Sequence, residues 1–138
     1  MQFIPFEPAH AYAFEAQGPQ KPFLEWMTPD IARLAAAYFA FTGVDHEGVV
    51  GCAGLAPSEE TDDLVAWALF SPRLFSNRIA VMRAVRQGLD LHKTRRIIAH
   101  VAPEHEKAAR FAEALNFRLV GDAPHPSGRP VLLYAREC

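Results

Sequence analysis

The segment SPRLFSNRIAV at residues 71–81 joins the apolar run LVAWALF to a long helical pattern. A strand that turns into a helix is a common place to hold a phosphate, because the first helical amides lack intrahelical partners and carry the positive end of the helix dipole. Such turns usually contain glycine, and this one has none. We therefore expect the helix amides to bind an anion, with a charge-assisted contact from Arg73 or Arg78.

A simpler interpretation of the same segment stays open. Ser76 and Asn77 are ordinary residues for the start of a helix, where a short polar side chain caps the exposed amides. The arginines at 73, 78, 83 and 86 are then solvated charges. Under this interpretation the turn holds no ligand.

Two histidines could move protons near neutral pH, since the histidine pKa lies close to it. His100 stands in the middle of the apolar run RIIAHV, and His105 follows Pro103. A structural role is the alternative for each of them. An acidic group precedes LVAWALF, but acidic runs at a turn are usually solvated; its members are Glu59, Glu60, Asp62 and Asp63.

Covalent and metal chemistry find little support in the sequence. Ser71 and Cys52 could be nucleophiles, but neither has a Gly-x-Ser-x-Gly elbow or an assignable His-Asp pair. The histidines at 92, 100 and 105 lack the spacing and the acidic or sulfur neighbours of a zinc site, so we expect no metal.

The composition predicts one globular domain over residues 1–138, with 50% hydrophobic and 22% charged residues. A net charge of −2 gives no global reason to expect nucleic acid or an anionic membrane as partner. Two cysteines form no disulfide framework. Because neither a signal-peptide pattern nor a run of roughly 18 apolar residues is present, we expect a cytoplasmic protein.

The elements expected from periodicity alternate between strands and helices. FIPF reads as a short edge strand, YFAFTG and GVVGCAGL as an antiparallel hairpin around Gly48, and LVAWALF as a central strand covered on both faces. Thr28 and Pro29 open a helix to about residue 37. FRLV and VLLYA close the chain as strands.

Two further helices follow the central strand. The first begins near residue 76 and should turn Ile79, Met82, Val85 and Leu89 toward the core. The second opens at Pro103 and should bury Ala108, Phe111, Ala112 and Leu115. The crossover from LVAWALF to RIIAHV should be right-handed and parallel. The fold class is therefore α/β (α+β), with a mixed sheet of about six to seven strands and helices on both faces, and a ligand is expected at the carboxyl end of LVAWALF.

From about residue 30 onward this order resembles the GNAT superfamily of acetyl-CoA-dependent N-acetyltransferases. EHEKAARFAEALNFRLVG is similar to the superfamily's helix that ends in Leu-Gly-Phe before the next strand, with Asn116 in place of the glycine. Asn is the next-best residue for the left-handed conformation that ends a helix. AWALFSPR resembles a small phage- and prophage-encoded branch of the superfamily.

The resemblance implies acetyl-CoA as co-substrate, an unknown amine as acceptor, a possible homodimer and no metal. Against the usual pyrophosphate loop, Arg/Gln-x-x-Gly-x-Gly/Ala, Phe75 and Arg78 depart from the pattern and only Ala80 matches. His105 stands where the family often has an Asn that contacts the cofactor. The residues implied to bind CoA are Leu69, Phe70, Arg73, Phe75, Ser76, Asn77, Arg78, Ile79, Ala80 and His105.

The catalytic groups are harder to assign. The family's tyrosine acid falls on Ala112, which has no hydroxyl, and Tyr134 reads as a half-buried strand residue. The resemblance thus leaves two functions open. One is an N-acetyltransferase that works mainly by positioning and a backbone oxyanion donor. The other is a catalytically weakened GNAT-fold module that binds a ligand or serves as a structural partner in a phage.

Overall fold

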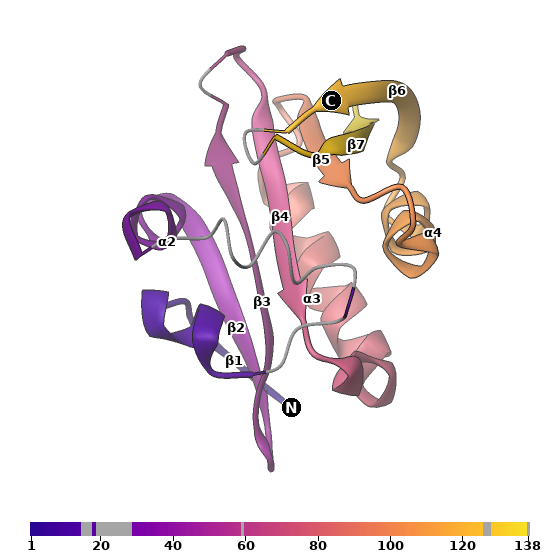
Figure 1. The fold of residues 1–138 in the computed structure, drawn as a ribbon. Helices are drawn as coiled ribbons and strands as arrows, with labels where there is room; N and C mark the ends of the chain where they lie inside the picture. The colour runs from indigo at the N-terminus through magenta and orange to yellow at the C-terminus, as the bar shows by residue number, and fades with distance from the viewer. Residues whose placement is uncertain (15–17, 19–28, 59, 126–127, 138) are drawn as a thin grey trace.

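The computed structural model describes residues 1–14, 18, 29–58, 60–125 and 128–137, shown in Figure 1. The expected alternation of strands and helices is confirmed. The elements are β1 (Gln2–Pro5), η1 (Pro8–Tyr12), α2 (Pro29–Ala36), β2 (Phe39–Asp45), β3 (Gly48–Pro57), β4 (Leu64–Phe70), η3 (Pro72–Asn77), α3 (Arg78–Leu91), β5 (Ile97–Val101), α4 (Glu106–Ala114), β6 (Arg118–Pro124) and β7 (Pro130–Arg136). The expected cap at Thr28 lies outside the described residues.

Within the described residues, the strands form one seven-stranded sheet in the order β1-β2-β3-β4-β5-β7-β6. Neighbouring strands are antiparallel except β4 and β5, which are parallel as expected for the crossover through α3. FIPF is the predicted edge strand, LVAWALF is central, and the β2–β3 hairpin turns at Gly48, whose φ of 117° favours glycine. The mixed α/β sheet is therefore as predicted.

Helices cover both faces of this sheet (Figure 1). On one face η1 and α2 pack against Cys52 and Leu69, and on the other α3 and α4 pack against residues such as Leu64 and Ile97. The alternation of side chains along each strand produces these two cores. Within the described part of the chain, no helix is long and apolar enough to cross a membrane.

The parallel pair β4 and β5 is short. Its register runs from Leu64 opposite Ile97 to Ala66 opposite Ala99 and then stops. β4 continues on β3 as far as Phe70, while β5 continues on β7 as far as Val101. The two central strands therefore part toward their carboxyl ends, as expected.

The start of α3 differs from the expectation. The helix begins at Arg78, because residues 72–77 form the 3₁₀ helix η3. The side chain of Ile79 is 69% exposed instead of buried. The buried stripe of α3 includes Val81, Gly88 and Leu89. At 100° per residue, Ile79 lies about 120° from Val85 at the centre of this stripe.

The end of α4 follows the expectation at Asn116. This residue has a φ of 70°, in the left-handed region. The amide of Phe117 donates to the carbonyl of Ala112 and the amide of Asn116 to that of Glu113, both at 3.0 Å. These two bonds make a Schellman motif, which satisfies the last carbonyls of the helix and turns the chain into β6.

We predict that Asn116→Ala lowers the free energy of unfolding by about 1 kcal/mol, because a β-carbon without a local hydrogen-bonding group is unfavourable in the left-handed conformation. Asn116→Gly should be neutral or slightly stabilising. Urea unfolding of the two variants measures the difference. Equal stability of the Ala and Gly variants would contradict this account of the helix end.

Candidate functional site

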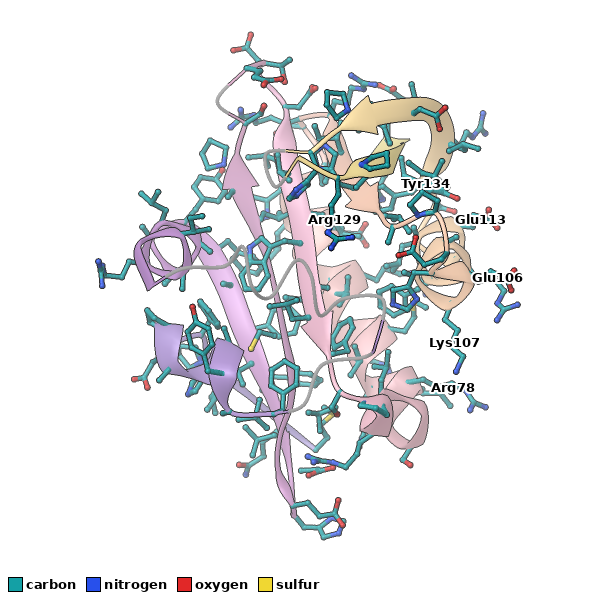
Figure 2. The ribbon with its side chains drawn as sticks, viewed as in Figure 1. Arg78, Glu106, Lys107, Glu113, Arg129 and Tyr134 are labelled. Atoms are coloured by element: carbon teal, nitrogen blue, oxygen red, sulfur yellow. The ribbon has the colours of Figure 1, made fainter. Side chains whose placement is uncertain are left out.

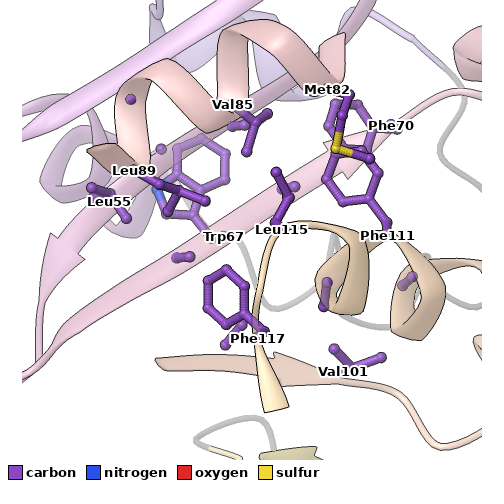
Figure 3. Close-up of a pocket in the computed structure, with 18 of the residues that line it drawn as sticks. Leu55, Trp67, Phe70, Met82, Val85, Leu89, Val101, Phe111, Leu115 and Phe117 are labelled. Atoms are coloured by element: carbon purple, nitrogen blue, oxygen red, sulfur yellow. The ribbon is translucent and has the colours of Figure 1, made fainter. Parts of the chain in front are cut away.

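A cavity of about 370 Å³ lies between α3 and α4, on the face of the sheet where β4 and β5 part. Figure 3 shows apolar side chains entering it from both helices and from the strands. Met82, Val85 and Leu89 come from α3, and Phe111 comes from α4. Phe70 and Phe111 meet edge to face with ring centroids 5.8 Å apart.

Small residues leave the space open. Several positions that line the cavity carry no side chain beyond Cβ: Ala53, Gly54, Ala66, Ala68, Gly88, Ala99, Ala108 and Ala112. Gly88 is required for another reason as well, because a β-carbon there would come within 2.9 Å of the Phe39 ring. A cavity of this size and apolar character is typical of a small-molecule site.

One end of the cavity is cationic. Arg78 at the first position of α3 lines it, as do Lys107 and Arg110 on α4. Figure 2 shows Arg78 and Lys107 on the same side of the molecule, with Glu106 nearby. The side chains of Arg78 and Arg110 are exposed, and neither makes a hydrogen bond or ion pair with a described residue. We call Arg78, Lys107 and Arg110 the cationic mouth.

The structure brings three of the expected cofactor residues to this cavity, namely Phe70, Arg78 and His105. The others lie elsewhere. Leu69 packs on the opposite face with Cys52. Ile79 points to solvent, and Ala80 does not line the cavity. Phe75, Ser76 and Asn77 lie in η3, where the Asn77 amide contacts Asp45 at 3.4 Å.

Arg73 is engaged inside the fold. Its guanidinium lies 3.1 Å from the Asp45 carboxylate and 3.3 Å from that of Glu47, and it donates to the carbonyl of Val49 at 3.1 Å. Burial raises the pKa of Asp45, but the hydrogen bond from the Glu47 amide and the charge of Arg73 outweigh burial. The pKa of Asp45 therefore lies below its ordinary value. Arg73 therefore anchors the β2–β3 turn instead of facing a ligand.

The N-cap in this segment also differs from the expectation. Ser71, not Ser76, caps the turn, since its Oγ accepts from the Arg73 amide at 3.2 Å. Ser76 is exposed. Ser71 is buried at 3% exposure, which agrees with the view that it is no nucleophile. Its role is to start η3.

His100 lies one residue beyond the last β4–β5 pair. Side chains alternate along β5, and its neighbours Ala99 and Val101 pack with α3 and α4, so His100 starts from the other face of the sheet. It lines the cavity, and its ring meets that of His125 with centroids 5.4 Å apart. Burial lowers the pKa of His100, although the Glu60 carboxylate raises it. Burial, with the neighbouring His100 charge, lowers the pKa of His125 to about 4. Both rings are therefore neutral at pH 7, and a neutral imidazole can accept a proton.

His105 is at the other face, where it precedes α4 and is 6% exposed. Burial lowers its pKa as well. Its amide donates to the carbonyl of Ala102 at 2.9 Å, so it holds the entry into α4. This position beside the cavity suits a contact to a ligand better than acid–base chemistry in water.

The remaining candidate catalytic residues, Tyr134 and Cys52, are buried in the core. Tyr134 is 3% exposed, more deeply buried in the core than the half-buried position expected for it. Burial raises the pKa of Cys52 to about 12, although the Thr42 hydroxyl bond lowers it, so this thiol stays protonated. Among the described residues, no three His, Cys, Asp or Glu side chains gather into a group that could hold a metal ion.

Sequence reasoning missed four residues of the site: Trp67, Lys107, Arg110 and His125. Lys107 and Arg110 lie three residues apart on one helix face, and this spacing of two cations was a usable signal. His125 comes from the β6–β7 connection and meets His100 only through the fold. The indole Nε1 of Trp67 is buried without a hydrogen-bond partner, next to Gly54.

Comparisons with solved structures agree with this architecture. Ard1 from Thermoplasma volcanium superposes with a TM-score of 0.71 at 16% identity, over 98% of this chain and 95% of that chain. The protein has a GNAT-like fold. A GNAT-family acetyltransferase from Bacillus anthracis gives a TM-score of 0.62 at 21% identity over 96% and 92%. A spermidine N-acetyltransferase variant from Vibrio cholerae superposes with a TM-score of 0.62 at 13% identity, over 99% of this chain and 95% of that chain.

Sequence comparison adds no closer relative. No protein-family model matches the chain, and no curated protein matches it. At identities of 13–21%, the likeness to the solved structures supports the fold, and the chemistry must be argued from the residues of this chain.

We predict that Arg73→Ala and Arg78→Ala separate stability from binding. Arg73→Ala should lower the free energy of unfolding by about 1–2 kcal/mol, since it removes charged hydrogen bonds that are partly screened by solvent. Arg78→Ala should change stability by less than about 0.5 kcal/mol, because this side chain has no described partner. Thermal and urea unfolding measure both. A larger loss in Arg78→Ala than in Arg73→Ala would show that the two roles are reversed.

Proposed function

We propose that the protein is an N-acyltransferase that binds acetyl-CoA or a related thioester between α3 and α4 and transfers the acyl group to an amine. The observation that carries the proposal is the parting of β4 and β5 beside an apolar cavity with a cationic mouth. A ligand with an anionic end and a narrow, less polar chain fits this arrangement. The GNAT-like fold supports the same reaction class by analogy.

Binding would use the cationic mouth first. The phosphates lie at Arg78 and Arg110, where the first amides of α3 add the positive end of the helix dipole. His105 and Phe70 border the path inward. The thioester then lies near Ala66 and Ala99, where the strands part.

Transfer would need a base on the side from which the amine arrives. We assign this role to His100, because it stands where the strands part and lines the cavity. The amine nitrogen attacks the thioester carbon, the N–C bond forms, and His100 takes the ammonium proton. The C–S bond breaks and the thiol of CoA leaves after protonation from water, since Ala112 offers no acid.

A catalytically weakened binding or structural module is the alternative. The burial of Tyr134 and the missing hydroxyl at Ala112 favour it, because losing one acid or base typically costs about 10²–10⁴ in rate. The phage-type resemblance of AWALFSPR belongs to this alternative. A cytoplasmic location and a homodimer through an edge strand remain predictions that either function shares.

The deciding experiment is calorimetric titration with acetyl-CoA and free CoA, followed by a turnover assay with a panel of amines. Binding with turnover supports the transferase, and binding without turnover supports the module. No binding of either ligand would overturn both.

We predict that Arg78→Ala weakens CoA binding about tenfold to 150-fold, which corresponds to roughly 1.5–3 kcal/mol for a hydrogen bond to a charged group. The loss should shrink at high salt as exposed charges are screened. Arg83→Ala is the matched control, because Arg83 is exposed on the same helix and does not line the cavity.

Dephospho-CoA identifies the phosphate that Arg78 contacts. Equal losses for CoA and dephospho-CoA indicate the pyrophosphate, whereas a loss for CoA alone indicates the 3′-phosphate. Unchanged affinity for both ligands in Arg78→Ala would mean that this arginine is only a solvated charge.

We predict that His100→Ala lowers kcat by about 10²–10⁴ with little change in acetyl-CoA affinity. In the unmodified protein, kcat should be flat around pH 7–8 and fall as the pH drops through the lowered pKa of His100, since the protonated ring cannot accept a proton. Glu60 and His125 are the titratable groups that face His100. His46→Ala, at a side chain 88% exposed in the β2–β3 turn, is the control. A pH profile unaltered in His100→Ala would exclude this base.

A further inference from the structure

The carboxylate of Asp45 contacts both ends of the 3₁₀ helix η3. Asp45 is the last residue of β2, and its side chain is 11% exposed. Its Oδ1 accepts a hydrogen bond from the guanidinium of Arg73, near the start of η3, at 3.1 Å. Its Oδ2 accepts from the side-chain amide of Asn77, the last residue of η3, at 3.4 Å. One residue of the hairpin therefore holds η3 at both ends, and α3 follows directly with Arg78.

The β2–β3 hairpin fixes the position of this carboxylate. Asp45 pairs with Gly48 at the end of the ladder, and its Oδ1 also accepts from the amide of Glu47 at 2.9 Å. The residue before η3 is tied to the same hairpin, because the amide of Ser71 donates to the carbonyl of Val50 at 2.8 Å. The hairpin therefore sets where η3 lies relative to the sheet.

Asn77 does not take the usual role of its position. It is the N-cap residue of α3, where an Asn side chain commonly accepts from the first helix amides. Here the side chain makes no capping bond, since its Nδ2 donates to Asp45 and, at 3.3 Å, to the carbonyl of Arg73. Its φ of −121° and ψ of 11° also differ from the extended conformation of a capping residue. The contact with Asp45 thus turns this side chain away from the amides at the start of α3.

Arg78 depends on this arrangement for its direction. It is the residue of α3 in the cationic mouth, and it follows Asn77 immediately. Its exposed side chain makes no hydrogen bond or ion pair with a described residue, so its backbone position orients it toward the cavity. A group that is ordered before the ligand arrives costs less to immobilise on binding.

We propose that Asp45 is a positioning residue for the anionic group of the ligand. Through η3 and Asn77 it holds Arg78 and the first turn of α3 in the place from which they bind. The inference rests on the proposed function, because it needs an anionic ligand at the cationic mouth. Asp45 does not line the cavity, so it acts through the fold.

The sign of the effect separates positioning from simple electrostatics. A carboxylate near an anion site repels the anion, so on charge alone its removal would tighten CoA binding. We expect the opposite. Asp45→Ala should weaken CoA binding about tenfold, which corresponds to a mouth that has its binding arrangement about a tenth of the time.

The test is calorimetric titration of CoA into the unmodified full chain, Asp45→Ala and the matched control Asp63→Ala. Asp63 also pairs with an arginine, Arg96 at 3.3 Å, its side chain is 15% exposed, and it does not line the cavity. Asp63→Ala should leave the affinity within about twofold, because it loses a comparable ion pair away from the mouth.

The outcomes separate this inference from the proposed function. Unchanged or tighter CoA binding in Asp45→Ala, or equal losses in Asp45→Ala and Asp63→Ala, would overturn the inference and leave the function standing. No binding of CoA by the unmodified protein would overturn both.

A double-mutant cycle tests whether Asp45 acts through Arg78. In an Arg78→Ala background, Asp45→Ala should cost less than about threefold in CoA affinity, because the group that it positions is gone. A loss as large as in the unmodified background would mean that Asp45 supports the fold in general, and it would overturn the inference.

Asn77→Ala decides the matter if Asp45→Ala does not fold. This variant removes the contact next to Arg78 and keeps the ion pair between Asp45 and Arg73. It should weaken CoA binding at least about threefold without lowering the midpoint of urea unfolding, since Asn77 makes no capping bond. Unchanged CoA affinity in Asn77→Ala would overturn the inference.

Discussion

The ladder between β4 and β5 ends after three residue pairs, and the rest of the site depends on this early end. Each strand remains paired on its outer side, β4 with β3 and β5 with β7. The backbone groups on these outer sides therefore keep their hydrogen-bond partners as the strands part. α3 follows β4 and α4 follows β5, so the two helices diverge with their strands. The cavity between them is a direct consequence.

The arginines around α3 and α4 form two groups, one with partners inside the fold and one at the cationic mouth. Near the carboxyl end of α4, Arg86 on α3 donates to the carbonyl of Ala114 on α4 at 3.1 Å. Arg136 on β7 joins Asp90 at 2.7 Å and the carbonyl of Leu115 at 3.1 Å. These contacts tie the ends of both helices together, and cations at the carboxyl end of α4 also suit its dipole. At the cationic mouth Arg78 and Arg110 have no such described partners, which leaves their charges for an anion.

Signals between residues close in the sequence predicted the fold well. The residues of the site could not be predicted equally well, because they meet through contacts between distant parts of the chain. Proline in FIPF, glycine at the hairpin, the apolar run of β4 and Asn116 after Leu115 each act within a few residues, so they can be read along the chain. The engagement of Arg73 could not be read in this way, because its partners Asp45 and Glu47 lie on the hairpin across the sheet. The pairing of His100 with His125 likewise joins residues from β5 and the β6–β7 connection.

The absence of glycine from SPRLFSNRIAV has a backbone explanation. No described residue of this segment has a positive φ, because η3 replaces the left-handed turn that glycine would serve. The same replacement uses backbone amides internally, since Leu74 donates to the Ser71 carbonyl at 3.1 Å and Arg73 to the Ser71 hydroxyl at 3.2 Å. Fewer amides of the turn then remain for a phosphate, so the side chains at the mouth must supply more of the attraction. Binding that depends on exposed guanidinium groups is screened by salt more strongly than binding to buried amides, so a glycine-free turn makes anion affinity sensitive to ionic strength.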